Sequence, residues 1–273
     1  MQKLIRSTGF AALMLVLLAC TQQQENSAVV LATTTSTENS GLLEYLLPEF
    51  QADAGVEVRV IAVGTGKALR MGEDGDVDLV MVHAKPAEEK FVAAGFGVER
   101  IELMYNDFVL VGPKNDPAGL NKLSDIEAVM SALALTDVAF LSRGDDSGTH
   151  KKELRLWKQA GVIPNSASYR ELGQGMGKTL QIANELQAYT MIDRGTWLAY
   201  DDAVDLDILF EEVPPLFNQY SVILINPGRY PDLNTQGAQA LIDWLVSEKG
   251  QMLIGSYEVK GKVLFKPNAR NKG

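Results

Sequence analysis

Short apolar runs alternate along the chain with stretches in which apolar residues recur every three or four positions. The alternation of apolar and polar residues from 56 to 61 predicts a half-buried strand, and the nearly all-apolar run from 77 to 82 predicts a central one. Further strands are predicted at 28–32, 138–141 and 189–192, and helices at 42–50, 86–94, 123–135, 151–160, 179–188 and 237–254. This alternation is typical of an α/β protein with a largely parallel sheet.

Two apolar runs each lead into a proline-bearing turn, one ending at Pro113 and the other at Pro227. These runs, 108–113 and 222–227, are the strands at which the chain could cross between two lobes. Residues 28–110 plus 220–273 would then form lobe 1, and residues 111–219 would form lobe 2. The pattern suggests an architecture of two α/β lobes with a hinge of two crossing strands.

The N-terminal residues have the pattern of an export signal. Lys3 and Arg6 precede an apolar stretch from 10 to 18 that is too short to span a bilayer. The stretch ends in Leu17-Leu-Ala-Cys20, which resembles the bacterial lipobox, in which the cysteine becomes the lipidated first residue. We therefore predict a signal peptide at 1–20, lipidation at Cys20 and a polar tether at 21–27, with an ordinary signal peptide cleaved elsewhere as the alternative.

Composition narrows the function classes. Cys20 is the only cysteine, which excludes both a disulfide framework and a site with several cysteine ligands. Acidic residues outnumber basic ones, 35 to 25, giving a net charge of −10. Nucleic acid is therefore not an expected partner. An acidic surface also gives an incoming anion no long-range attraction, so any anion site must depend on local donors.

Five consecutive hydroxyl-bearing residues, Thr33 to Thr37, stand between the strand predicted at 28–32 and the helix predicted at 42–50. A strand-to-helix turn directs unpaired backbone N–H groups and the positive end of the helix dipole at one point, and hydroxyls add neutral donors. Serine and threonine are also favoured as helix N-caps, so a cap is the competing interpretation. One cap needs only one hydroxyl, and the run fits half of an anion site equally well.

Other predicted strand-to-helix turns carry the same kinds of residue: Val63–Lys67, Leu141–His150, Gly173–Thr179 and Asp193–Thr196. Each by itself could be a plain turn. In open α/β sheets, however, ligands bind beyond the carboxyl ends of the strands, where such turns converge. Their hydroxyl, glycine N–H and arginine groups are donors, so the site favours a ligand rich in acceptors, such as an oxyanion.

Arg143 and Arg194 are the expected charge partners of that anion. The alternative for each is a structural ion pair, above all between Arg143 and Asp145 or Asp146. A carboxylate near the site could orient an arginine, or it could accept the proton of a ligand such as hydrogen phosphate. The orienting role fits a fully ionised anion, and the proton-accepting role fits a protonated one.

The sequence offers little to support catalysis. Gly173–Thr179 has three residues between its outer glycines, whereas a P-loop needs four. No Gly-x-Ser-x-Gly elbow is present, and the only two histidines, His83 and His150, lack the spacing of a zinc protease. We therefore expect no enzyme, no cofactor and no bound metal cation, with a secreted anion-handling hydrolase as the less favoured alternative.

Six motifs in order resemble one family. They are Thr33–Thr37, Ala62–Gly66, Gly75–Asp78 with Val82–Ala84, Met104–Val109, Ser142–His150 and Tyr189–Thr196. Together they are similar to the tungstate-binding proteins of TupA type, the extracytoplasmic solute-binding components of tungstate ABC transporters. The resemblance runs from about Val30 to Leu264. The Arg143–Thr149 segment also resembles phosphate-binding proteins, so phosphate stays as an alternative ligand.

The resemblance implies a type II periplasmic-binding-protein fold that holds an unprotonated tetrahedral oxyanion between its lobes. The ligand would be tungstate, with molybdate as an alternative that size and charge cannot separate from it. A monomer would deliver this anion to a membrane permease while anchored outside the cytoplasm, in the periplasm or at the cell surface. By this resemblance the expected contacts are Thr34, Thr35, Ser36 and Thr65 on lobe 1, and Arg143, Ser147, Thr149 and Arg194 on lobe 2.

Overall fold

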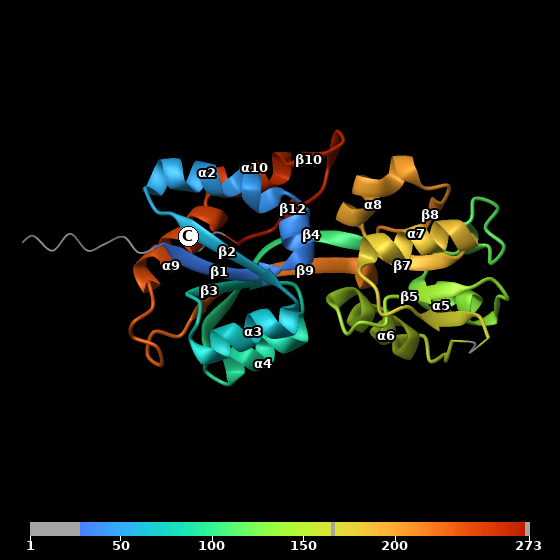
Figure 1. Ribbon diagram of the computed structural model, residues 1–273, viewed down its shortest axis with the longest axis horizontal. Helices are drawn as coiled ribbons and strands as arrows, with labels where there is room; N and C mark the ends of the chain where they lie inside the picture. Colours follow the sequence, from blue (N-terminus) through green and yellow to red (C-terminus); the bar gives the residue numbers. More distant parts are fainter. Residues whose placement is uncertain (1–27, 165–166, 271–273) are drawn as a thin grey trace, which may run out of the picture.

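The computed structural model describes residues 28–164 and 167–270. Figure 1 shows two groups of elements side by side, joined by the strands β4 (Gly97–Gly112) and β9 (Phe217–Ile225). The group with both ends of the described chain is called the first half, and the other is the second half. The predicted signal peptide, lipidation site and tether lie outside the described residues.

The first half is built on parallel strands that follow one another in sequence. Strands β1 (Val29–Thr34), β2 (Val58–Val63) and β3 (Leu79–Val82) are ordered β2-β1-β3, and β9 and β4 extend this sheet as antiparallel partners. Its helices are α1 (Thr35–Asn39), α2 (Leu42–Ala54), α3 (Thr65–Asp74), α4 (Lys85–Ala93), α9 (Thr235–Val246) and α10 (Glu248–Ser256). Near the C-terminal end lie the short strands β10 (Glu258–Val259), β11 (Lys262–Val263) and β12 (Lys266–Pro267).

The second half continues the same sheet through β4. Its order is β4-β7-β5-β6, with β8 also paired to β4; the strands are β5 (Phe140–Ser142), β6 (Tyr169–Glu171), β7 (Tyr189–Asp193) and β8 (Asp207–Phe210). Its helices are α5 (Ile126–Leu135), α6 (Gly148–Gln159), α7 (Met176–Leu186) and α8 (Arg194–Tyr200). Three short 3-10 helices complete it: Leu120–Lys122, Asp201–Ala203 and Pro214–Leu216.

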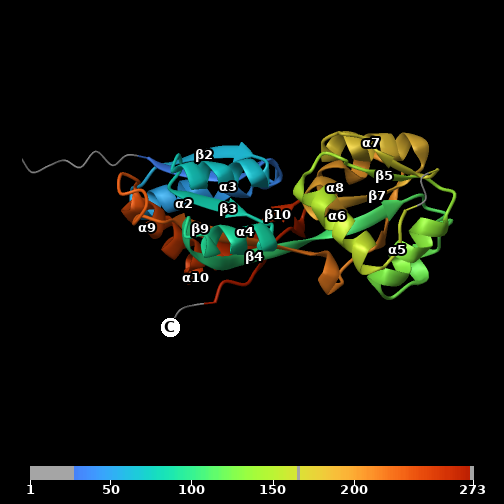
Figure 2. The same ribbon diagram turned by 90° about the horizontal axis from the view of Figure 1, so that it is seen from below.

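Strand direction brings the ends of the two sets of parallel strands together. β3 is antiparallel to β9, and β9 is antiparallel to β4, so β1, β2 and β3 run in the same direction as β4, toward the second half. β7 is antiparallel to β4, and β5 and β6 run parallel with β7. The carboxyl ends in one half therefore face those in the other. Figure 2 shows β4 running from the first half into the second.

The change of partner along β4 marks the junction of the halves. Asp107 is the last residue of β4 opposite β9, where it pairs with Phe217, and Phe108 is the first opposite β7, where it pairs with Asp193. The predicted boundaries at 110 and 220 lie within three residues of these pairs. They remain a prediction, because a change of register does not by itself divide a chain into lobes.

One predicted helix is wrong in its extent. The helix expected at 237–254 is two helices, α9 and α10, which meet at Ser247. Ser247 has extended backbone angles, φ −65° and ψ 164°, and its side chain accepts a hydrogen bond from the backbone N–H of Gly250. The apolar spacing continues from α9 into α10, so the pattern alone does not indicate the break. A single residue, Ser247, ends one helix and caps the next.

The apolar faces of the helices cover the sheet in each half. Leu31, Leu46, Phe50 and Leu241 are fully buried in the first half, and Phe140, Trp157 and Tyr189 are 3% exposed or less in the second. This burial holds the strand-to-helix turns in place at the junction. Within the two described ranges, no helix is both long enough and apolar enough to cross a bilayer.

Candidate ligand-binding site

A cleft of about 390 Å³ opens where the carboxyl ends of the two sets of strands face each other. The first half lines it with Thr34–Ser36 from the end of β1, Gly64–Lys67 from the start of α3, and His83 after β3. The second half lines it with Arg143 and Asp145–Thr149, from the turn after β5 and the start of α6, together with Lys151. Seven of the eight predicted contacts, all except Arg194, therefore lie around one cleft.

The hydroxyl run forms a compact cluster at the end of β1. Thr34 is the N-cap of α1, and its Oγ1 accepts a hydrogen bond from the backbone N–H of Thr37 at 3.2 Å. The same Oγ1 lies 2.7 Å from Thr37 Oγ1 and 3.0 Å from Ser36 Oγ. The cap interpretation and the site interpretation are thus both consistent with this turn, because one hydroxyl caps the helix while Thr35 and Ser36 line the cleft.

Helix α3 begins at the cleft without a side-chain cap. Its N-cap is Gly64, which has no side chain to offer, and the first intrahelical bond runs from Ala68 N–H to the Gly64 carbonyl. The backbone N–H groups of Thr65, Gly66 and Lys67 are therefore the unpaired donors of the first turn. Aimed at a cleft, such groups attract the oxygens of an anion.

The arginine turn supplies a positive charge whose position the fold holds. Gly144 and Asp146 both have left-handed backbone angles, φ 59° and 58°, and a Cβ on Gly144 would lie 2.6 Å from the Cβ of Glu171. Glycine is therefore required where this turn passes β6. Arg143 Nη2 donates to Asp145 Oδ2 at 2.5 Å, whereas Arg143 Nε is buried with no hydrogen-bond partner among the described residues. A buried unpaired donor beside the cleft suits a ligand oxygen.

Asp145 has both carboxylate oxygens occupied by donors from its own turn. Oδ2 accepts from Arg143, and Oδ1 accepts from the backbone N–H of Ser147 at 3.2 Å. Burial alone would raise the pKa of Asp145, but the hydrogen bonds from Ser147 and the charge of Arg143 lower it. An ionised, occupied carboxylate orients the arginine.

A buried glutamate holds the arginine turn from behind. Glu153 on α6 is 2% exposed and accepts from Ser142 Oγ at 2.6 Å, Trp157 Nε1 at 3.0 Å and Tyr169 OH at 2.8 Å. Burial raises the pKa of Glu153, and these three donors oppose that rise. Because Ser142 directly precedes Arg143, this network fixes the position from which the guanidinium enters the cleft.

The structure places Arg194 away from the cleft. Its guanidinium donates to both oxygens of Asp107, from Nε at 2.5 Å and from Nη2 at 2.7 Å, and Nη2 also contacts Glu211 at 2.5 Å. Hydrogen bonding to Asp107 raises the pKa of Arg194. It lines a separate pocket of about 130 Å³ next to β4. The structural ion pair, which was the alternative interpretation, describes this arginine.

Two other predicted turns line an adjoining hollow of about 520 Å³. Gly175–Gly177 at the start of α7 contribute to it, as do Asp193, Gly195 and Thr196 around the start of α8. Asp193 caps α8 by accepting from Thr196 N–H at 2.8 Å. The hollow shares Thr35, Ser36 and Arg143 with the first cleft, so the two spaces lie next to each other around these residues.

The sequence argument did not include His83 among the site residues. It lines the cleft directly after β3, and its Nε2 lies 3.1 Å from Thr34 Oγ1 and 3.3 Å from Ser36 Oγ. Burial lowers its pKa. The position of His83 directly after β3 could have identified it as a site residue. Because β3 is parallel to β1, its carboxyl end lies at the same edge of the sheet as the hydroxyl run.

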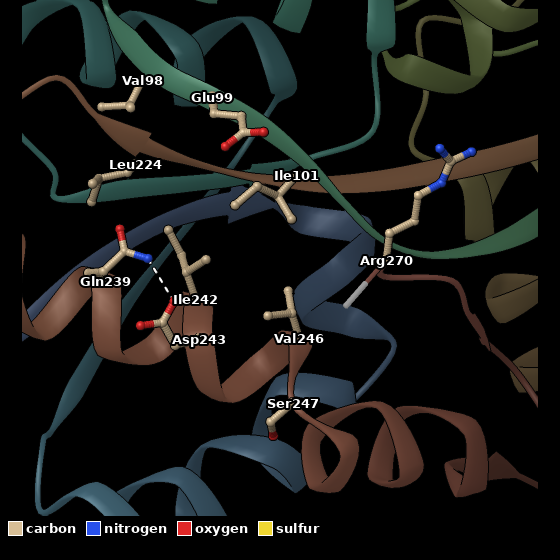
Figure 3. Close-up of a pocket in the computed structure, with 10 residues that line it drawn as sticks. All are labelled: Val98, Glu99, Ile101, Leu224, Gln239, Ile242, Asp243, Val246, Ser247 and Arg270. Atoms are coloured by element: carbon tan, nitrogen blue, oxygen red, sulfur yellow. Dashed lines mark hydrogen bonds between the residues drawn. The ribbon is translucent and has the colours of Figure 1, made fainter. Parts of the chain in front are cut away.

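A cavity of about 360 Å³ elsewhere in the first half has a different character. Figure 3 shows it between α9 and the strands β4 and β9, with Gln239 donating to Asp243 at 2.8 Å on the helix side. Ile101, Leu224 and Ile242 add apolar surface, and the charged side chains of Glu99 and Arg270 also line it. It lacks the turns that bring donors together, so it is a poor anion site. Among residues 28–164 and 167–270, no group of three His, Cys, Asp or Glu side chains could hold a metal ion.

The fold and the cleft define a class of protein. A family model described as a PBP superfamily domain matches residues 21–249. The chain therefore belongs to the PBP superfamily, and the predicted periplasmic-binding-protein fold is confirmed.

Within this superfamily the similarity is specific. The chain is 52% identical over 238 residues to the tungstate-binding protein TupA of Peptoclostridium acidaminophilum, covering 86% of this chain and 83% of that protein. It is 37% identical over 242 residues to TupA of Campylobacter jejuni, covering 87% and 90%. The solved structure of TupA from Desulfovibrio alaskensis G20 superposes with a TM-score of 0.83 at 47% identity, covering 89% of this chain and 99% of that one. The chain belongs to the TupA family, which confirms the resemblance of its six motifs.

Proposed function

We propose that this protein binds the tungstate oxyanion outside the cytoplasmic membrane and delivers it to the permease of an ABC transporter. The observation that carries the proposal is the cleft itself, where hydroxyls, free N–H groups and Arg143 converge from opposing strand ends. The named function of the TupA relatives supports tungstate as the ligand. A structure titled as the tungstate ABC transporter from Geobacter sulfurreducens, 50% identical with a TM-score of 0.77, supports the transport role.

In this proposal the two halves are lobes that close on the anion through β4 and β9. Thr34, Thr35, Ser36 and the start of α3 at Thr65 bind from one side, and Arg143, Ser147 and Thr149 bind from the other. Arg194 is left out of the ligand set because Asp107 and Glu211 already occupy its guanidinium. The role of Arg194 is instead to tie α8 to β4 at the hinge.

The chemistry of the lining favours a fully ionised dianion. Each ligand oxygen buried without a donor costs about 1–3 kcal/mol, so a site made of donors selects ligands with acceptors only. Hydrogen phosphate would bring one O–H group, and both oxygens of Asp145 already accept hydrogen bonds from its own turn, which makes this carboxylate a weaker acceptor for that proton. Sulfate is smaller and would not reach all donors at once. Molybdate has nearly the same size and charge as tungstate, so we expect it to bind as well.

The role proposed here is binding rather than catalysis, with no cofactor. The export signal and the lipid anchor at Cys20 belong to the same proposal, as does a monomer that presents its closed form to the permease. They place the binding step outside the cytoplasm, on the side from which an importer takes its ligand. A secreted hydrolase is the competing function, and its test is turnover of a phosphate ester.

A thermal-shift panel with tungstate, molybdate, sulfate and phosphate tests the proposal. A ligand at one hundred times its Kd stabilises the folded state by about 2.7 kcal/mol, which raises Tm by roughly 5–10 °C for a chain of this size. We expect this shift with tungstate and molybdate and little change with sulfate or phosphate. A response to phosphate alone would overturn the assignment of the ligand.

A further inference from the structure

His83 connects the hydroxyl cluster of the cleft to the two strands that join the halves. On the cleft side its Nε2 faces Thr34 Oγ1 and Ser36 Oγ. On the other side its Nδ1 lies 2.9 Å from Asn218 Oδ1. Asn218 of β9 pairs directly with Asn106 of β4, next to the position where β4 leaves β9 for β7. The ring is therefore the link between the strands of the junction and the proposed anion donors.

The surroundings of Asn218 determine which ring nitrogen carries the proton. Asn218 Nδ2 donates to Asn106 Oδ1 at 2.9 Å and to Tyr220 OH at 3.1 Å, and all three side chains are buried. The amide nitrogen is thus occupied, which leaves Asn218 Oδ1 as the acceptor facing His83. Nδ1 must donate to this oxygen, so in a neutral ring Nε2 is the acceptor.

An acceptor at Nε2 competes with the ligand for hydroxyl hydrogens. A hydroxyl has one hydrogen, and any hydrogen given to Nε2 by Thr34 or Ser36 is not available to an anion. Thr34 Oγ1 already accepts from Thr37 N–H, so its own hydrogen is its only contribution as a donor. With neutral His83, the cluster at the end of β1 would thus bind an anion with fewer donors than it contains.

We propose that His83 takes up one proton at Nε2 when the cleft binds a dianion, so that the hydroxyl of Thr34 or Ser36 that donates to the ring turns toward the anion. This inference rests on the proposed function and extends it. The proton comes from solvent, Nδ1 keeps its bond to Asn218, and no covalent bond to carbon or oxygen changes. The imidazolium then donates to the Thr34 and Ser36 oxygens while their hydrogens bind ligand oxygens. The bound complex gains one positive charge that offsets half of the ligand's charge.

The groups around the ring are consistent with a neutral free state. Burial lowers the pKa of His83, while the hydrogen bond to Asn218 and the charge of Asp193 on β7 raise it. The ring of Tyr220 on β9 lies 4.7 Å away, and a Cβ on Gly148, at the positive end of α6, would lie 3.1 Å from His83 Cε1. The other charged groups that line the cleft are Lys67, Arg143, Asp145, Asp146 and Lys151.

The sign of the pH dependence follows from this arrangement. A bound dianion favours the protonated ring and raises the pKa of His83 in the complex. At a pH between the pKa of His83 in the free protein and its pKa in the complex, the complex holds up to one more proton than the free protein. Affinity therefore increases as the pH falls through this range, by at most about tenfold per pH unit.

The test is titration calorimetry with tungstate at fixed pH in buffers of different ionisation enthalpy, together with long-range 1H–15N spectra of the histidine rings. The chain has two histidines, so a His150→Gln variant assigns both sets of signals. We expect uptake of up to one proton per tungstate and a ring that changes from Nδ1–H alone to protonation at both nitrogens. Binding with no linked proton, or with Nε2 unprotonated in the complex, would overturn the proposal.

A His83→Gln variant distinguishes the effect of a titrating ring from the effect of a hydrogen-bond donor at this position. Glutamine can offer a neutral N–H to the hydroxyls but cannot titrate, so we expect tungstate to bind with the pH slope removed. His150→Gln should keep the slope. A slope that persists in His83→Gln would assign the proton to another group and contradict the inference. If the native protein gives no thermal shift with any oxyanion, the proposed function fails instead, so the two failures are distinguishable.

Discussion

At the scale of single residues, the same side-chain chemistry leads to different roles in different surroundings. Arg143 and Arg194 each follow a strand and precede a helix, and both were expected to bind the anion. Arg194 lies beside Asp107 on β4, which takes two of its donors, whereas Arg143 gives one donor to Asp145 and keeps Nε unpaired. The partner carboxylates come from different parts of the fold, and for Arg194 no local pattern reveals them.

Replacement of Arg143 tests the residue scale directly. Arg143→Ala removes a positive charge of the cleft, and charge-assisted hydrogen bonds contribute about 1.5–3 kcal/mol, so tungstate affinity should fall by at least about tenfold. Titration calorimetry gives the change, and the unfolding transition checks the fold. Arg170→Ala, an exposed arginine on β6, is the matched control and should leave affinity unchanged. Equal affinity of Arg143→Ala and the native protein would remove Arg143 from the site.

At the scale of elements, hydrophobic spacing predicted where strands and helices lie but not how each one ends. The strands predicted at 28–32, 77–82 and 189–192 correspond to β1, β3 and β7, because buried strands are nearly continuous apolar runs. Helix α6 begins at Gly148, three residues before the predicted start, since Ser147 caps it from within the arginine turn. Caps are made by single polar residues, which a periodic pattern does not register.

The junction of α9 and α10 provides a test of capping. Ser247 Oγ accepts from Gly250 N–H at 3.2 Å and donates to the Trp244 carbonyl at 2.6 Å. Ser247→Ala should lower the free energy of unfolding by about 0.5–2 kcal/mol, measured by denaturant titration. Ser131→Ala, where an exposed hydroxyl bonds the Glu127 carbonyl within α5, should have a smaller effect. No difference between the two variants would show that the cap contributes nothing.

At the scale of the whole molecule, ion pairs connect the two halves beyond β4 and β9. Lys260, between β10 and β11, lies 2.7 Å from Asp201 and 2.7 Å from Asp202 in the 3-10 helix after α8. These contacts favour the arrangement in which the halves approach each other. Exposed pairs contribute about 0–1 kcal/mol, so the effect on lobe closure should be small and dependent on salt.

We expect Lys260→Met to raise the radius of gyration of the ligand-free protein and to weaken tungstate binding by no more than about fivefold. Small-angle scattering and calorimetry at low and high salt measure these changes. Lys114→Met is the matched control because Lys114 and Asp205 form an exposed pair within the second half, at 2.5 Å. If both variants give the same radius and affinity as the native protein, the pairs of Lys260 do not influence closure.

The sequence by itself determined the class of the fold and the chemical nature of the site. Local spacing decides strand and helix, and the hydroxyls, glycines and Arg143 occur in contiguous turns whose position after a strand predicts where they open. Only the tertiary structure decided which turns share the cleft, because β4 changes its partner from β9 to β7 at the junction. Asp107, far from Arg194 in sequence, pairs with it for the same reason. The network from Asn106 through Asn218 to His83 likewise joins residues from three strands or their ends. Contacts between distant segments depend on strand order and register, and neither is encoded in the pattern of any one segment.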